Sequence, residues 1–196
     1  MAHQLPSDVK LILASKSPRR RELLTEMGLT FEILTRDTDE SCPASVHPRR
    51  AAELLSERKA RAVAEIAPKN AIILASDTIV EVDGVAFGKP TDKEDAARML
   101  SVLSGRHHNV HTGVCLIYGD QVLMGVDTTD VCFHALDCAD IDWYISTGEP
   151  MDKAGAYGIQ GLGGKLVSHI NGHMDTVIGL PCELVKTLLE KLDLHA

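Results

Sequence analysis

A cluster of hydroxyl and cationic side chains lies where a predicted strand meets a predicted helix. An apolar run ends at Ser15, Ser17 is a good helix N-cap, and Pro18 suits the first helical position. Three arginines at residues 19–21 then fall in the first helical turn, where the helix dipole favours anions and opposes cations. A run of arginines alone is most often a solvated basic turn. At a strand-to-helix corner, it indicates a site for a polyphosphate.

A carboxylate interrupts one of the most apolar segments of the chain. Asp77 lies within Ala71–Val82, and an ionised carboxylate in an apolar strand is costly unless it is paired or bound to a metal. An aspartate that caps a turn at a strand end is the alternative. Because ionisable groups in apolar surroundings often mark functional sites, we interpret Asp77 as a functional residue.

Two lysines could add positive charge near this carboxylate. In the predicted helix Pro48–Ala67, Lys59 shares a face with the apolar residues, so its ammonium group needs an anion if it is buried. Snorkelling at the edge of the apolar stripe is the alternative. Lys89 follows a short strand and would be a surface residue if considered alone. Cations around an anion, with a carboxylate that can hold a metal or polarise water, suggest phosphoanhydride hydrolysis.

The segment Gly155–Gly164 is rich in glycine, which lets the backbone approach a ligand closely. Considered alone, it is more typical of a plain hairpin. It is not a G-x-G-x-x-G that opens a helix, and no G-x-x-x-x-G-K-[ST] occurs, which excludes Rossmann and P-loop interpretations. The sequence also lacks G-x-S-x-G, H-E-x-x-H and a Cys/His ligand set. We therefore interpret the histidines as structural or solvated residues.

The residues singled out so far must be positioned by a mixture of strands and helices. Strands are predicted at Val9–Ala14, Phe31–Leu34, Ala71–Val82, Val85–Phe87, Val110–Tyr118, Gln121–Phe133, Ala156–Ile159 and Leu166–Ile170. Helices are predicted at Pro18–Met27, Pro48–Ala67, Lys93–Leu103, Ala139–Ser146 and Glu183–Leu192. Capping boxes are predicted from Thr91 with Glu94 and from Asp137 with Asp140. The hairpin turns Asp83-Gly84 and Gly119-Asp120 indicate a mixed rather than a purely parallel α/β sheet.

Composition narrows the classes of function. A formal net charge of −8 argues against nucleic-acid polymers and anionic membranes as partners, because both need a broad basic surface. The five cysteines are odd in number and form no C-x-x-C pair, which favours a reducing compartment. No signal-peptide core and no apolar run of ~20 residues is present, so a cytoplasmic location is expected. Residues 1–8 are expected to form a flexible N-terminus.

Short motifs follow one another in an order that is specific, although each motif alone is a weak signal. They are Ser15-Lys16-Ser17-Pro18-Arg19-Arg20, Ala75-Ser76-Asp77-Thr78, Gly88-Lys89-Pro90, Leu103-Ser104-Gly105-Arg106, the segment Asp152–Gly161, and Ile178-Gly179-Leu180-Pro181. Together they resemble the Maf family of nucleoside triphosphate pyrophosphatases, from about Leu11 to Leu192. The resemblance implies a single Maf-like domain over residues 1–196. Its mixed twisted sheet and flanking helices would form two lobes around a central cleft, as in inosine triphosphate pyrophosphatases.

The resemblance also implies a reaction and a set of site residues. A nucleoside triphosphate and water would give a nucleoside monophosphate and pyrophosphate, assisted by Mg²⁺ or Mn²⁺. The acidic segment Asp37–Glu40 should supply a metal- or water-binding glutamate, which we place at Glu40. The implied catalytic residues are Asp77, Lys59 and Lys89, the substrate-binding residues are Ser15, Arg19, Arg20, Thr78 and Gln160, and the metal ligands are Glu40 and Asp77.

Two of the residues that match the family bear on which nucleotide is the substrate. Thr78 after the aspartate, and Gln160 in the glycine-rich turn, look like the branch of the family that acts on dTTP and UTP. Arg19 looks like a substrate-discriminating residue in that branch. A 7-methyl-GTP pyrophosphatase is one alternative, and a non-catalytic nucleotide-binding regulator of cell division is another. The enzyme is favoured because a pure binder has no need of Asp77 in an apolar strand. The oligomeric state stays open, with a homodimer as one form to test.

Overall fold

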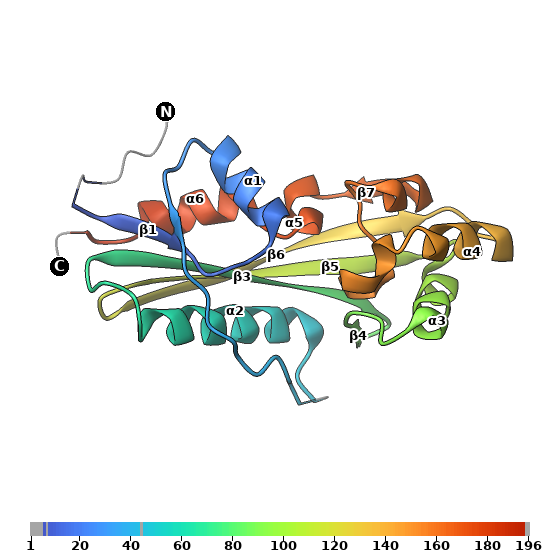
Figure 1. Cartoon of the computed structure of the whole chain (residues 1–196), viewed down its shortest axis with the longest axis horizontal. Coiled ribbons are helices and arrows are strands. Elements are labelled where there is room, and N and C mark those ends of the chain that lie inside the picture. The colour runs from blue at the N-terminus through green and yellow to red at the C-terminus, as the bar shows by residue number, and fades with distance from the viewer. Residues whose placement is uncertain (1–5, 7, 44, 195–196) are drawn as a thin grey trace.

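The structure is a computed structural model that describes residues 6, 8–43 and 45–194. Seven strands of one sheet run through it, with helices on both faces (Figure 1). The strands are β1 (Lys10–Leu13), β2 (Glu32–Ile33), β3 (Ala71–Val82), β4 (Val85–Phe87), β5 (His107–Tyr118), β6 (Gln121–Phe133) and β7 (Val167–Asn171). The α-helices are α1 (Pro18–Glu26), α2 (Pro48–Ala64), α3 (Lys93–Leu103), α4 (Cys138–Ser146), α5 (Met174–Ile178) and α6 (Cys182–Glu190). The 3₁₀ turns are η1 (Glu149–Asp152), η2 (Ala154–Ala156) and η3 (Leu162–Leu166).

The sheet is mixed, as the hairpin signals predicted. Its order is β2-β1-β3-β5-β6-β7, with β4 paired to β3. Strand β1 runs parallel to β2 and β3, whereas the pairs from β3 to β7 are antiparallel. Both predicted hairpin turns are present, with positive φ at Asp83, Gly84 and Gly119. The expected flexible N-terminus, residues 1–8, falls mostly on residues outside the described part of the chain.

Side-chain alternation along β1 and β3 divides the first half of the sheet between two helical layers. Leu13 and Leu74 pack with α1 and α6 on one face, and Ile12 and Ile73 pack with α2 on the other. Figure 1 shows the same arrangement, with α2 on one side of the sheet and α1, α5 and α6 on the opposite side. A sheet covered on both faces explains why Ala71–Val82 reads as an almost continuous apolar run.

A separate apolar cluster lies at the far ends of the long strands. There α3 and α4 pack on β3, β5 and β6 through residues such as Leu100, Phe133 and Tyr144, all nearly inaccessible to solvent. The polar residues 76–78 of β3 fall between this cluster and the two clusters near β1. The division of the chain into one domain with two lobes stays a prediction.

Apart from shifted ends of helices and strands, two local predictions are wrong. Ala156–Ile159 is not a strand, because Gly155 and Ala156 both have positive φ and the chain turns through η2. The cap of α3 is Asp92, which accepts a hydrogen bond from the amide of Asp95, so the predicted box of Thr91 with Glu94 lies one residue too early. The capping box of α4, formed by Asp137 and Asp140, is confirmed.

A buried histidine in the α3–α4 cluster makes the fold sensitive to acid. The Nε2 atom of His108 lies 2.8 Å from the Tyr157 hydroxyl, and its Nδ1 has no hydrogen-bond partner among the described residues. Burial lowers the pKa of His108 from its usual 6.5 to about 4. The unfolded chain therefore binds more protons than the folded chain between pH 6.5 and pH 4, and stability falls as the pH drops through that range.

We predict that protonation of His108 in the unfolded chain lowers the free energy of unfolding by up to ~3 kcal/mol when the pH falls from 7 to 4. Urea titrations of the wild-type protein and of His108→Gln at several pH values measure this contribution. The glutamine keeps a polar contact for Tyr157 but has no proton to gain. Its stability should depend less steeply on pH than that of the wild type, and equal slopes would show that His108 does not titrate in this way.

Candidate active site

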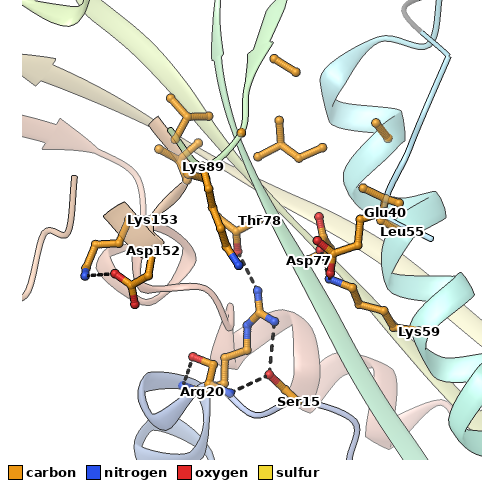
Figure 2. A pocket seen from close by; sticks show the side chains of 18 of the residues that line it. Ser15, Arg20, Glu40, Leu55, Lys59, Asp77, Thr78, Lys89, Asp152 and Lys153 are labelled. Atoms are coloured by element: carbon orange, nitrogen blue, oxygen red, sulfur yellow. Dashed lines mark hydrogen bonds and ion pairs between the residues drawn. The ribbon is translucent and has the colours of Figure 1, made fainter. Parts of the chain in front are cut away.

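The predicted site residues line one cleft. Its volume is about 1190 Å³, and its walls come from the β1–α1 corner, the loop before α2, helix α2, strand β3, the segment after β4 and the glycine-rich turn. Figure 2 shows the central group of these side chains. All the residues assigned from the sequence are on these walls: Ser15, Arg19, Arg20, Glu40, Lys59, Asp77, Thr78, Lys89 and Gln160.

The β1–α1 corner has the cap that the sequence predicts. The Ser17 hydroxyl accepts a hydrogen bond from the Arg20 amide, and Gly28 follows the end of α1 with a positive φ of 74°. The Ser15 hydroxyl oxygen accepts a hydrogen bond from the Ser17 amide at 3.2 Å, which holds Ser15 next to the N-terminus of α1. The start of α1 therefore places Arg19 and Arg20 on the cleft wall, whereas the amides of Ser17 and Arg20 are used within the corner.

Arg20 connects this corner to two distant segments. Its guanidinium donates to the Gly179 carbonyl at 2.9 Å. It also donates to the Thr78 hydroxyl at 3.3 Å and to the Ser15 hydroxyl at 3.4 Å (Figure 2). Removal from solvent lowers the pKa of Arg20, and the nearby Asp77 carboxylate opposes that shift. The guanidinium is therefore fixed in one orientation before any ligand binds.

A second group of charges lies on the α2 side of β3. The ammonium group of Lys59 donates to Asp77 and also pairs with Glu40 at 2.8 Å. The side chains of Lys59 and Asp77 are only 17% and 11% exposed, whereas that of Glu40 is 60% exposed. The hydrogen bond from Lys59 holds the pKa of Glu40 below its usual value. Lys59 thus has the anion partners that its place on the apolar face of α2 requires, and it does not snorkel away.

Strand geometry and one glycine bring this group together. Asp77 has the same parity as Ile73 and Ala75, so it faces α2, whereas Thr78 faces α1. Gly113 lies opposite Asp77 in β5, and a Cβ there would be 2.2 Å from the Ala52 carbonyl of α2. Only a residue without a side chain lets α2 approach the sheet this closely, which brings Lys59 within reach of Asp77.

The acidic loop supplies one of its carboxylates to the cleft group. Glu40 points to Lys59, whereas Asp39 accepts hydrogen bonds from the amide and hydroxyl of Ser41. Asp37 is fully exposed and lies 3.5 Å from Lys16. The structure therefore distinguishes Glu40 from its acidic neighbours by its pairing with Lys59, and its role as a metal ligand stays a prediction.

The charge of the cleft is opposite to that of the whole chain. Within the described residues, its walls have more basic than acidic side chains, although the formal net charge is −8. The basic residues are Lys16, Arg19, Arg20, Arg36, Lys59, Lys89 and Lys153, and the acidic ones are Asp37, Glu40, Asp77 and Asp152. The side chains of Arg19 and Lys89 make no hydrogen bond or ion pair with any described residue, so both can contact an anionic ligand in the cleft.

The far wall contains residues to which the sequence assigned no role. Lys153 pairs with Asp152 at 2.6 Å and donates to the Glu149 carbonyl at 2.9 Å, directly before the glycine-rich turn that presents Gln160. Thr112 of β5, which lies behind the cleft wall, was also missed, although its hydroxyl lies 2.9 Å from that of Thr78 and fixes its position. A lysine next to a glycine-rich turn is a usable sequence signal, whereas Thr112 lies in an ordinary strand pattern.

Fold and cleft define an α/β protein with a cationic, carboxylate-containing pocket. The architecture is similar to that of the Ham1 protein of Staphylococcus aureus, with a TM-score of 0.50 at 15% identity over 92% of this chain and 98% of that chain. At this identity the likeness shows the fold alone. The Maf-like protein family matches residues 10–192, and the chain belongs to this family.

Curated relatives share much of the sequence over nearly the full length. A protein of Symbiobacterium thermophilum is 49% identical over 88% of both chains, and one of Thermococcus kodakarensis is 47% identical over 92% of this chain and 95% of its own. A protein of Bacillus velezensis is 44% identical over 95% of this chain and 98% of its own. Each of the three is named dTTP/UTP pyrophosphatase. None of the helices that the structure describes is long and apolar enough to cross a membrane.

Proposed function

We propose that the chain hydrolyses dTTP and UTP to the nucleoside monophosphate and pyrophosphate. One observation carries this proposal. The same cleft contains cationic side chains without an ion-pair partner, Arg19 and Lys89, and the paired group of Lys59, Asp77 and Glu40. Cations neutralise a triphosphate, and a carboxylate in partly dry surroundings can accept a proton from water. The names of relatives with 44–49% identity support the same reaction and substrates.

Different residues of the cleft would carry out different parts of the reaction. Ser15, Arg19 and Arg20 at the start of α1 would hold the phosphates, and Lys89 would stabilise the charge that develops on the leaving pyrophosphate. Asp77 would accept the proton of the water that attacks the α-phosphorus, and Lys59 would orient that carboxylate. Thr78 contributes by fixing the guanidinium of Arg20.

A divalent cation fits the donor set of the cleft. Glu40 and Asp77 offer carboxylate oxygens, the ligands that Mg²⁺ and Mn²⁺ prefer, and both converge on the ammonium group of Lys59. Their contact with the same ammonium group supports the proposal that the two carboxylates could share a bound cation. Glu40 and Asp77 would therefore hold the metal, which would polarise the phosphate oxygens and lower the pKa of a bound water.

The glycine-rich turn that contains Gln160 could recognise the base of the nucleotide. Gln160 is exposed on the cleft wall, and its amide can both donate and accept hydrogen bonds. Uracil and thymine present an acceptor–donor–acceptor edge, which suits such an amide or the neighbouring backbone groups. Cytosine reverses part of this pattern and would leave polar groups unpaired.

We predict that Gln160→Ala lowers the preference for UTP over CTP more than it lowers the turnover of UTP. Competition assays that contain both nucleotides measure the ratio of kcat/KM directly. Gln160→Glu serves as a matched control, because it keeps the size of the side chain but replaces the donor by a second acceptor. A UTP preference that is unchanged in both variants would remove Gln160 from base recognition.

A substrate panel tests the proposed function. The untagged protein would be incubated with dTTP, UTP, CTP, ATP and 7-methyl-GTP in the presence of Mg²⁺ or Mn²⁺, and pyrophosphate release would be measured. We expect dTTP and UTP to be hydrolysed far better than the others. Preferred hydrolysis of 7-methyl-GTP would refute the assignment from Thr78 and Gln160. Tight nucleotide binding without turnover would instead favour the regulator. A cytoplasmic location and a homodimer stay predictions.

A further inference from the structure

Three residues distant in sequence meet in a row across one end of the sheet. The strands β5, β6 and β7 are neighbours (Figure 1), His107 pairs with Cys132 in their register, and Cys132 pairs with His169. One nitrogen of each imidazole and the Cys132 sulfur all lie within 4.8 Å of one another. The two imidazole rings are 5.5 Å apart between centroids and nearly perpendicular. We propose that His107, Cys132 and His169 form a binding site for a borderline divalent transition metal such as Zn²⁺.

The ligand types select the class of metal. One thiolate and two imidazoles are the donors preferred by Zn²⁺, Co²⁺ and Ni²⁺, whereas Mg²⁺ and Mn²⁺ prefer oxygen. Three protein ligands leave a fourth position for water. Both histidines are exposed, so that position faces the solvent. The proposed site therefore differs in chemistry and in place from the carboxylates of the cleft.

A carboxylate supports the first of these ligands. The Nδ1 atom of His107 lies 2.8 Å from an oxygen of Asp130, which is two residues before Cys132 in β6. An ionised carboxylate only accepts hydrogen bonds, so the imidazole donates from Nδ1 and keeps the lone pair on Nε2. Histidines that bind metals usually have such a partner, which sets the tautomer and the ring orientation.

The place of the cluster in the fold keeps it accessible. His107 has the same parity as His111 in β5, so it faces the α2 side of the sheet. His111 is already near the start of that helix, since its ring lies 6.2 Å from that of His47 at the α2 N-cap. His107 is the first residue of β5, four residues before His111, and its side chain is 60% exposed. A metal ion can therefore reach the row of ligands from solvent.

The other cysteines are less suited to binding a metal. Burial raises the pKa of Cys115 and of Cys182 to about 12, so both stay protonated near neutral pH. Cys42 lies on the cleft wall and Cys138 is exposed at the start of α4. Neither belongs to a group of three potential ligands among the described residues. These two cysteines supply matched controls for Cys132.

Cobalt titration tests the site, because a cobalt–thiolate bond gives a charge-transfer band in the near ultraviolet. The reduced, untagged full chain would be titrated anaerobically with Co²⁺ in excess Mg²⁺, which occupies oxygen sites. We expect a thiolate band that saturates at one Co²⁺ per chain, that persists in Cys42→Ser and Cys138→Ser, and that disappears in Cys132→Ser. No band in the wild type, or a band that persists in Cys132→Ser, would overturn the proposal.

Two further variants separate binding from folding. Asp130→Asn keeps all three ligands but removes the carboxylate partner of His107, and we expect it to weaken Co²⁺ binding by ~10–100-fold. Zn²⁺ should raise the Tm of the wild type but not that of His169→Ala, and the Tm without metal should be the same for both proteins. An equal rise in Tm for the wild type and His169→Ala would also overturn the proposal.

Discussion

Replacing Asp77 by Asn is expected to lower the turnover of UTP by ~10²–10⁴-fold, the usual effect of losing a general base. Asparagine has the same shape but accepts a proton poorly and offers a metal one neutral oxygen. The proposed phosphate-binding corner at Ser15, Arg19 and Arg20 is untouched, so the Kd for UTP should change only a few-fold. Pyrophosphate release and calorimetric titration measure the two quantities separately.

An acidic residue of the nearby loop provides the matched control. Asp39 lies next to Glu40 in sequence, but its carboxylate accepts hydrogen bonds from Ser41 and does not line the cleft. Asp39→Asn changes the net charge by the same amount as Asp77→Asn and should keep near wild-type turnover. If Asp77→Asn also keeps near wild-type turnover, Asp77 has no part in the mechanism.

Replacing Lys59 by Met should cost about 3 kcal/mol of unfolding free energy at pH 7, because it leaves the buried Asp77 carboxylate without its partner. The same change brings Asp77 and Glu40 into repulsion without a cation between them. Methionine fills a similar volume and restores the apolar packing on α2, so the loss reports mainly on charge. Denaturant unfolding measures the free energy.

The double variant Lys59→Met with Asp77→Asn tests the cause of this loss. Removing the charge of Asp77 also removes the penalty for an unpaired buried carboxylate, so the double variant should recover more than half of the lost stability. If the two single losses simply add in the double variant, the stability effect of Lys59 does not arise from its pairing with Asp77.

Long periodic segments made much of the fold predictable. The bounds of β3 and α3 match the prediction, because a long apolar run and an amphipathic repeat each end at clear turn residues. Helix α2 was predicted three residues too long. Its last turn tightens, with the amides of Ile66 and Ala67 both donating to the Val63 carbonyl, ahead of Pro68, which disfavours helical geometry in the preceding residue.

The candidate site was predicted as a set of residues, but not as a set of contacts. Asp77 and Lys59 each conflict with their apolar surroundings, which single residues can reveal. The contact of Arg20 with Gly179 joins segments 159 residues apart, and the contact of Glu40 with Lys59 depends on an irregular loop. No local pattern encodes such pairs. The row of His107, Cys132 and His169 was missed for the same reason, since only strand register brings it together.

Hydrolysis of UTP in ¹⁸O-labelled water tests the central claim most directly. If the Asp77-activated water attacks the α-phosphorus, mass spectrometry will find UMP and pyrophosphate in equal amounts, with the label in UMP alone. Label in pyrophosphate, or products that are UDP and inorganic phosphate, would show attack at another phosphorus. Either result would contradict the proposed arrangement of the triphosphate in the cleft.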